Sequence, residues 1–205
     1  MKKILYTLFL FNISLSVYAL DYSDYTGSFS ERSMIMHSIE GRDRMNQQDR
    51  DTLSEKKLTP TTICLFNQIK KNDYNNVKTL LEAKLNPNVS YMSDYPIYYA
   101  ARLNRTEIVY LLYEYGAKLD KGFYSELYEA VRNKNNELAQ FLLDKNAKVN
   151  YTDAITNNTI LSMALKNSMY DIARQLIERG AYADNRSIQI IKKKKLMYLI
   201  PDSGK

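Results

Sequence analysis

The chain has 205 residues, of which 45% are hydrophobic and 25% charged, so length and composition suit a folded domain and exclude global disorder. The formal charge of +6 at pH 7 is a modest surplus, and we expect no nucleic-acid partner from it. The chain has one cysteine, Cys64, and one histidine, His37, which excludes an intrachain disulfide and a Cys/His zinc cluster. Because no motif organises a Cys64–His37 dyad, we interpret the pair as a buried thiol and a surface imidazole.

The first 19 residues have the pattern of an export signal. Lys2 and Lys3 precede an apolar run of about a dozen residues, and Val17 and Ala19 occupy the small-residue positions of a cleavage site. The alternative is an uncleaved anchor, but residues 4–18 fall short of the ~20 apolar residues that span a bilayer. We therefore expect cleavage after Ala19, which lowers the charge to +4 and leaves no stable membrane span.

Residues 20–58 form a different segment. Its beginning is polar and aromatic and reads as a loop, whereas Met34 to Leu53 carries widely spaced apolar residues among charges and suits one helix. We interpret residues 20–58 as an N-terminal arm or cap, with a functional arm as the alternative.

From Leu58 onward, one pattern of two short amphipathic helices recurs. Paired small or apolar residues mark each first helix, as in Ala100-Ala101, and a Leu-rich stripe marks each second helix. Leu80, Leu112, Leu142 and Leu176 occupy one position of that stripe at steps of 32, 30 and 34 residues. Helices this short bury too little surface to stand alone, so the units are expected to stack.

The repeated segments resemble the ankyrin repeat family. Tyr95-Pro-Ile-Tyr-Tyr-Ala-Ala101 is similar to its Thr-Pro-Leu-His-x-Ala-Ala motif, and Ile108 to Asp120 is similar to its second-helix ending, which recurs at Leu138–Asn150 and Ile172–Asp184. The resemblance covers about residues 60–185 and implies an all-α solenoid of about four helix–turn–helix repeats. We expect repeats at 59–90, 91–120, 121–150 and 151–184, with a C-terminal cap and tail at 185–205.

The helix ends and the last helix give further expectations. Gly116, Gly180 and Asn146 suit the left-handed residue that ends a helix, whereas Lys84 is a poor substitute. In residues 187–200, Ile188, Ile191 and Leu199 are expected to cover the end of the stack. The lysines at 192–195 then face water; a nuclear-import or anionic-surface patch is the weaker alternative.

The resemblance also places a groove along the hairpin tips and the exposed side of the first helices. At one first-helix position the leading residue is basic in all four units, so stacking predicts a basic stripe, although family consensus usage explains it equally well. The exposed pairs are Lys70-Lys71, Arg102-Leu103, Arg132-Asn133 and Lys166-Asn167. The tips add the adaptable side chains Tyr91, Met92, Asp94, Lys121, Tyr124 and Ile155.

These observations predict a non-enzymatic, monomeric module that binds another protein, expected to carry an acidic surface, through the groove. No phosphate loop, paired-carboxylate motif or metal spacing appears, so we expect no catalytic residue, cofactor or metal. The alternative is a secreted effector or an inhibitor or immunity-type factor that acts through the arm. The Lys-, Asn-, Ile- and Tyr-rich composition and the short signal suggest a bacterial source and a periplasmic or secreted location.

Overall fold

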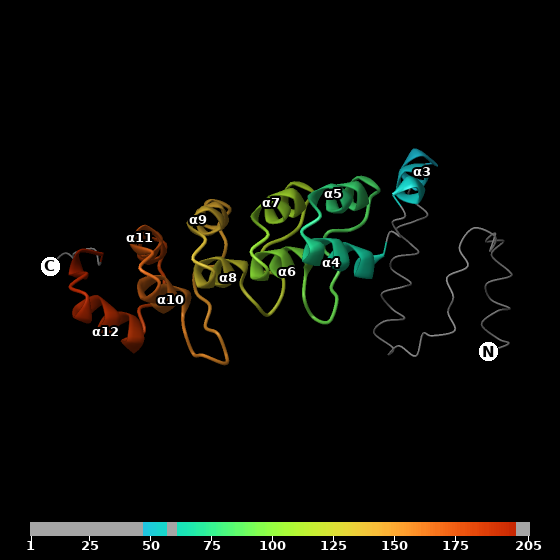
Figure 1. Cartoon of the computed structure of the whole chain (residues 1–205). Helices are drawn as coiled ribbons and strands as arrows, with labels where there is room; N and C mark the ends of the chain where they lie inside the picture. Colours follow the sequence, from blue (N-terminus) through green and yellow to red (C-terminus); the bar gives the residue numbers. More distant parts are fainter. Residues whose placement is uncertain (1–46, 57–60, 200–205) are drawn as a thin grey trace, which may run out of the picture. The chain divides into compact units, whose positions relative to one another are not determined.

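A computed structural model describes residues 47–56 and 61–199. The chain divides into two units, Met1–Ser33 and Met34–Lys205. The first unit contains the predicted signal and lies outside the described residues. Within the second unit the predicted all-helical repeats are present (Figure 1). The described helices are α3 (Gln47–Glu55), α4 (Thr62–Lys71), α5 (Tyr74–Glu82), α6 (Pro96–Arg102), α7 (Thr106–Glu114), α8 (Glu126–Arg132), α9 (Asn136–Asp144), α10 (Ile160–Lys166), α11 (Tyr170–Glu178), α12 (Asn185–Lys193) and the 3₁₀ turn η2 (Met197–Leu199).

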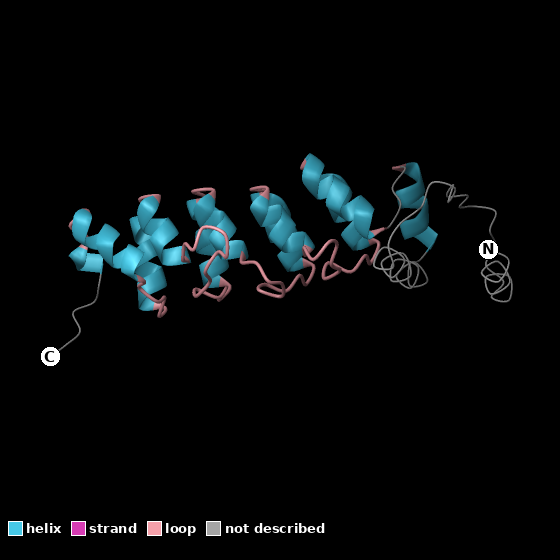
Figure 2. Cartoon of the chain, turned by 90° about the horizontal axis from the view of Figure 1, so that it is seen from below, coloured by secondary structure: helices cyan, strands magenta, loops and turns pink. Residues whose placement is uncertain are grey.

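The helices from α4 to α11 form antiparallel pairs that stack in two rows. The first helices α4, α6, α8 and α10 pack on one another in order, and α5, α7, α9 and α11 form the second row (Figure 1). A tight turn joins the two helices of each pair, and its left-handed residue is Asn72, Asn104, Lys134 or Ser168. Longer loops join successive pairs and emerge along one side of the stack (Figure 2).

Small residues let the first helices approach closely. Ala100, Ala101, Ala130 and Ala164 are fully buried, as are the stripe leucines Leu80, Leu112, Leu142 and Leu176 of the second helices. The predicted helix endings are confirmed, because Gly116, Gly180, Asn146 and also Lys84 all have positive φ. Lys84 therefore adopts the conformation that its side chain disfavours.

Additional helices cover both ends of the repeats. Leu53 of α3 is buried and α3 contacts α5, so this part of the arm packs on the first repeat. At the other end α12 packs on α10, and its C-cap Lys194 and left-handed Lys195 repeat the geometry that ends α8. Ile191 and Leu199 are buried as expected, whereas Ile188 is 36% exposed and does not belong to the buried residues of α12.

Side chains in the loops lock neighbouring repeats together. The Asn88 side chain accepts a hydrogen bond from the Lys118 N–H at 2.9 Å and donates one to the Gly116 carbonyl at 2.8 Å. Asp120 accepts from the Lys148 N–H at 2.7 Å, and Asn150 accepts from the Tyr182 N–H at 2.8 Å. The recurrent Asn or Asp of each unit thus holds one loop to the next.

Candidate functional site

The candidate site is the side of the stack formed by the first helices and three loops, at residues 83–95, 115–125 and 145–159. We call this side the hairpin face. In the first loop, Tyr91 and Asp94 form a two-residue hairpin with backbone bonds of 2.8 and 3.0 Å. In the third, Thr152 and Thr159 pair in the same antiparallel way. Side-chain bonds from Asn88 to the second loop and from Asp120 to the third join the three loops in order.

Arg102 lies at the centre of this face and is engaged by its own repeat. Its Nη2 lies 3.0 Å from Oδ2 of Asp94, and its guanidinium lies 5.0 Å from the ring centre of Tyr99 and 5.6 Å from that of Tyr98. Burial raises the pKa of the Asp94 carboxyl, while the Arg102 charge opposes the rise. Asp94 thus compensates the positive charge of Arg102, which the sequence analysis assigned to the basic stripe.

Arg132 occupies the same position one repeat later and is also paired. Its Nη2 lies 2.9 Å from Oε2 of Glu129, whose side chain is only 6% exposed, and the Tyr98 hydroxyl donates to Oε1 of Glu129 at 3.2 Å. Burial raises the pKa of Glu129, and Arg132 opposes the rise. The middle of the predicted stripe is therefore charge-balanced rather than basic.

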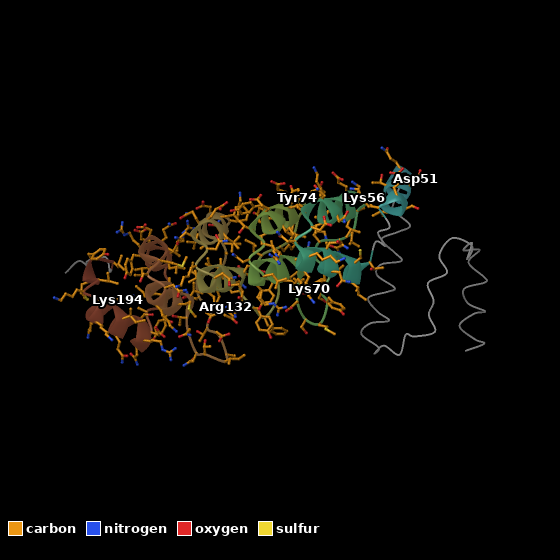
Figure 3. All side chains as sticks on the ribbon, in the orientation of Figure 1. Asp51, Lys56, Lys70, Tyr74, Arg132 and Lys194 are labelled. Atoms are coloured by element: carbon orange, nitrogen blue, oxygen red, sulfur yellow. The ribbon has the colours of Figure 1, made fainter. Side chains whose placement is uncertain are left out.

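The outer members of the stripe differ from the middle ones. Lys70, Lys71 and Lys166 are exposed, and among the described residues none of them lies in an ion pair. Figure 3 shows Lys70 and Arg132 on the row of first helices, apart from Tyr74 on the second row. The first helices of the first and fourth repeats thus carry positive charge that no ion pair compensates.

Two other predicted residues, Asn133 and Asn167, face the neighbouring repeat. The Asn133 amide donates to the Ala101 carbonyl at 3.2 Å and the Asn167 amide to the Val131 carbonyl at 2.7 Å, so both cap the end of the preceding first helix. Leu103 stands at the same position and is half-buried. The Asn133 and Asn167 side chains therefore bond to the preceding repeat and do not belong to the basic stripe.

The predicted tip residues have unequal exposure. Met92 is 74% and Ile155 93% exposed, whereas Tyr91 is half-buried with its ring 5.4 Å from that of Phe66. Tyr124 is 46% exposed and stacks on Tyr98 at 5.1 Å. Lys121 lies with its Nζ 3.3 Å from the Asn88 carbonyl oxygen and 5.0 Å from the ring centre of Tyr95.

Phe123, which the sequence analysis missed, is 86% exposed at the tip of the second loop. The sequence could have indicated this exposure, because Phe123 directly follows Gly122 in a short polar loop, where side chains are seldom buried. Met92, Phe123 and Ile155 therefore place one large apolar side chain on each of three consecutive tips. We call these three residues the tip row.

Within the described residues, a small-molecule pocket and a metal site have weaker support than the hairpin face. A shallow hollow of about 510 Å³ lies between the turns of the first two repeats, lined by Asn72, Tyr74 and residues 104–108. Within the part that the structure describes, no cluster of His, Cys, Asp or Glu could hold a metal ion, and no helix is long and apolar enough to cross a membrane. Cys64 is half-buried, and His37 lies outside the described residues.

Comparisons with known proteins agree with this architecture. Residues 65–153 match the family model for ankyrin repeats in three copies. The chain is similar to two ankyrin repeat proteins of fowlpox virus (strain NVSL). It is 32% identical to FPV240 over 123 residues, covering 58% of this chain and 30% of the relative. It is 24% identical to FPV034 over 145 residues, covering 68% of this chain and 34% of the relative.

A solved structure extends the agreement to three dimensions. The human ASB11 ankyrin repeat domain aligns with a TM-score of 0.50 at 21% identity, over 63% of this chain and 67% of that domain. The described residues therefore have the ankyrin repeat fold. The chain spans about a third of the length of the curated relatives that it matches, and these viral relatives do not support the bacterial source suggested by composition.

Proposed function

We propose that the ankyrin repeat array of this chain binds another protein through the hairpin face and carries out no reaction of its own. Ankyrin repeats are generally protein–protein interaction modules, and a stack of this kind offers an extended surface made from every repeat. The observation that carries the proposal is the set of exposed side chains on this face that the fold does not use: the tip row, Lys70 and Lys166.

The charge of the face indicates the chemistry of the partner. Because Arg102 and Arg132 are compensated by Asp94 and Glu129, they add little net attraction for an acidic surface. Lys70 and Lys166 retain uncompensated charge, so the proposed partner carries acidic groups that meet the two ends of the face. Exposed charges of this kind act mainly on association and are screened by salt.

The test reverses these two charges and asks whether partner capture is lost. In affinity capture from native extract, Lys70→Glu combined with Lys166→Glu should lower recovery of the partner by about tenfold at low salt. The matched control is Lys192→Glu with Lys193→Glu, since these lysines also lie in the last turn of a helix and carry the same helix-dipole cost. If the Lys70/Lys166 variant captures as well as this control, the proposal is wrong and residues 20–58 become the candidate binding element.

The proposal includes export of the chain. It is supported by the basic, apolar and small-residue pattern of residues 1–19, and it places the mature protein in the periplasm or outside the cell that makes it. The mass of the purified protein should correspond to a chain that begins at Leu20, and fractionation should recover it outside the cytoplasm. A full-length mass in the cytoplasmic fraction would contradict export while leaving the binding proposal intact.

A further inference from the structure

The last described elements of the stack hold almost all of the surplus positive charge. Residues 185–199, which form α12 and η2, contain five basic residues and no acidic one. The rest of the chain contains 24 basic and 23 acidic residues, so nearly the whole net charge of +6 comes from this one segment. A concentration of one sign of charge attracts partners of the opposite sign.

No ion pair compensates this charge among the described residues. The four lysines at 192–195 are all exposed, and none of them lies in an ion pair. Lys194 is used by the stack, since its Nζ donates to the Leu165 carbonyl at 3.0 Å. Arg186 donates to the Thr156 carbonyl at 3.2 Å, which is a neutral acceptor. Lys192, Lys193 and Lys195 therefore keep their charge available for a ligand.

The acidic residues next to this segment are engaged or balanced. Asp184 caps the start of α12, where its Oδ1 accepts from the Ser187 N–H at 2.8 Å. Eight residues of helical rise place it ~12 Å from Lys192 along the axis. The neighbouring helix α11 with its C-cap is neutral, since it has two acidic and two basic residues: Asp171, Glu178, Arg174 and Arg179.

Comparison with the other repeats shows which side of α12 is uncovered. We count back from the left-handed turn residue that follows each first helix, which is Lys195 for α12. Ile188 then corresponds to three residues that are at most 1% exposed, namely Ile97, Leu127 and Leu161. Lys192 corresponds to three fully buried residues, namely Ala101, Val131 and Leu165. A following first helix packs on α6, α8 and α10, whereas no described first helix follows α12, so Ile188 is 36% exposed and Lys192 is exposed.

Another copy of the stack is a poor occupant of this uncovered side. Stacking in the manner of the internal repeats would bury Lys192 where those repeats bury alanine, valine or leucine. Burial of an unpaired charge is strongly unfavourable. A ligand that meets the ammonium groups at a hydrated, anionic surface fits this side better.

Exposed apolar side chains accompany the lysines. Met197 and Tyr198 of η2 are 56 and 64% exposed, in addition to Ile188. We call six residues the end surface: Ile188, Lys192, Lys193, Lys195, Met197 and Tyr198. They belong to α12 and η2 at one end of the stack (Figure 1). Lysines beside exposed apolar and aromatic side chains are typical of proteins that bind anionic bilayers, where the lysines meet headgroups and the apolar groups enter the interface.

We propose that the end surface attaches the chain peripherally to a membrane that carries anionic lipid headgroups. The lysines supply attraction that salt screens, and Ile188, Met197 and Tyr198 supply apolar contact that salt does not screen. A polyanion without an apolar phase would use the lysines and leave the three apolar side chains in water. The end surface shares no residue with the tip row, Lys70 or Lys166, so this inference does not depend on the proposed function.

Vesicle cosedimentation tests the proposal. The full chain is mixed at low salt with vesicles of phosphatidylcholine alone or of about 70% phosphatidylcholine and 30% phosphatidylglycerol. Affinity for the anionic vesicles should be at least about tenfold higher and should fall as salt is added. Because the apolar residues 4–18 can bind lipid themselves, variants with the same N-terminus are compared.

Two matched lysine variants show whether the end surface causes the preference. The end variant should lose at least about tenfold in affinity for anionic vesicles and carries Lys192→Gln, Lys193→Gln and Lys195→Gln. The control should bind like the original chain and carries Lys70→Gln, Lys71→Gln and Lys134→Gln. Both variants lose two lysines from the last turn of a helix and one left-handed turn residue. If the two variants bind alike, net charge and not the end surface governs binding, and the proposal is wrong.

A tryptophan reporter locates the contact. The chain has no tryptophan, so Tyr198→Trp places a single indole on the end surface. Its emission should shift to shorter wavelength with anionic vesicles and be quenched by lipids with brominated acyl chains, because the ring enters the interface. Phe123→Trp, at a hairpin tip that is 86% exposed, should show neither response. An equal response from both reporters would overturn the assignment to the end surface.

The apolar residues distinguish a bilayer from other anions. Met197→Ser with Tyr198→Ser should lower vesicle affinity at least about threefold, whereas Met92→Ser with Phe123→Ser should leave it unchanged. Duplex DNA and polyglutamate, which lack an apolar phase, should bind more weakly than the anionic vesicles. If either polymer binds as tightly as the vesicles and the Met197/Tyr198 variant keeps its vesicle affinity, the end surface is a general polyanion site and the membrane proposal fails.

Discussion

Glu126 is a carboxylate that the fold buries almost completely. It follows the N-cap Ser125 at the start of α8, is 1% exposed, and its Oε2 accepts a hydrogen bond from the Asp120 N–H at 3.2 Å. Burial raises its pKa to about 7, and the Asp120 charge adds to the rise, whereas the backbone N–H groups and Lys148 oppose it. The residue that orders the second loop therefore changes charge near neutral pH.

This carboxylate should make stability depend on pH. Between the ordinary pKa of 4.5 and about 7, the folded chain holds a proton that the unfolded chain has lost, so the free energy of unfolding falls as pH rises through this window. At about 1.4 kcal/mol per pH unit the loss amounts to at most ~3 kcal/mol. Glu126→Gln should remove this part of the pH dependence and be more stable than the original chain at pH 8.

Urea unfolding at pH 5 and pH 8 measures the effect. The difference between the original chain and Glu126→Gln isolates this group from the half-buried Asp94 and the buried Glu129, which are present in both proteins. Glu107→Gln, on the exposed first turn of α7, serves as the control. If the original chain and Glu126→Gln have the same pH profile, burial does not control this carboxylate.

At the scale of elements, each first helix is capped by the repeat that follows it. The last-turn carbonyls of α4, α6, α8 and α10 accept side-chain donors from the next unit. These donors are Arg105 to Lys70, Asn133 to Ala101, Asn167 to Val131 and Lys194 to Leu165. Helix ends leave carbonyls without helical partners, so these contacts satisfy them and tie the repeats together. Lys194 extends the series to α12, which thus takes the place of a fifth first helix.

Removing two of these caps separates a structural role from a binding role. Asn133→Ala with Asn167→Ala should cost about 1 kcal/mol for each site, because a side-chain hydrogen bond to a helix end is lost and a carbonyl is left for water. Partner capture should be unchanged, since both side chains bond to the preceding helix and neither belongs to the basic stripe. If the double variant keeps its thermal stability but no longer captures the partner, Asn133 and Asn167 contact the partner, as the sequence analysis expected.

The elements also show what the sequence could and could not predict. The burial of Ala100, Ala130 and Ala164 was predictable because the repeat period fixes which side of each helix faces its neighbour. The use of Asn133 as a cap was not, since it depends on how one repeat is placed over the carbonyls of another. The Arg102–Asp94 pair likewise depends on a hairpin that brings Asp94 back to its own helix.

At the scale of the described stack, repetition made the fold predictable and left the surface undetermined. Four units at one period give several independent signals for the same architecture, and each unit contacts mainly its neighbours. The basic stripe rested on one position repeated four times. The Glu129–Arg132 pair could have been read from its i, i+3 spacing on one helix, whereas the Asp94–Arg102 pair depends on the hairpin. Charge distribution on such a surface follows from loop geometry, which varies between units.

A linear stack should lose stability locally when its end is damaged. Ile191 of α12 is fully buried, and α12 packs on α10, so Ile191→Ala removes apolar contact where only one neighbouring first helix supports it. A large-to-small core substitution of this type costs ~2–5 kcal/mol. Because coupling passes from repeat to repeat, hydrogen exchange should accelerate most in α10 and α11 and little in α6 and α7. Ile188→Ala, at a position 36% exposed on the same helix, should change exchange far less. Equal acceleration from α6 to α11 would instead mean that the repeats unfold as one cooperative unit.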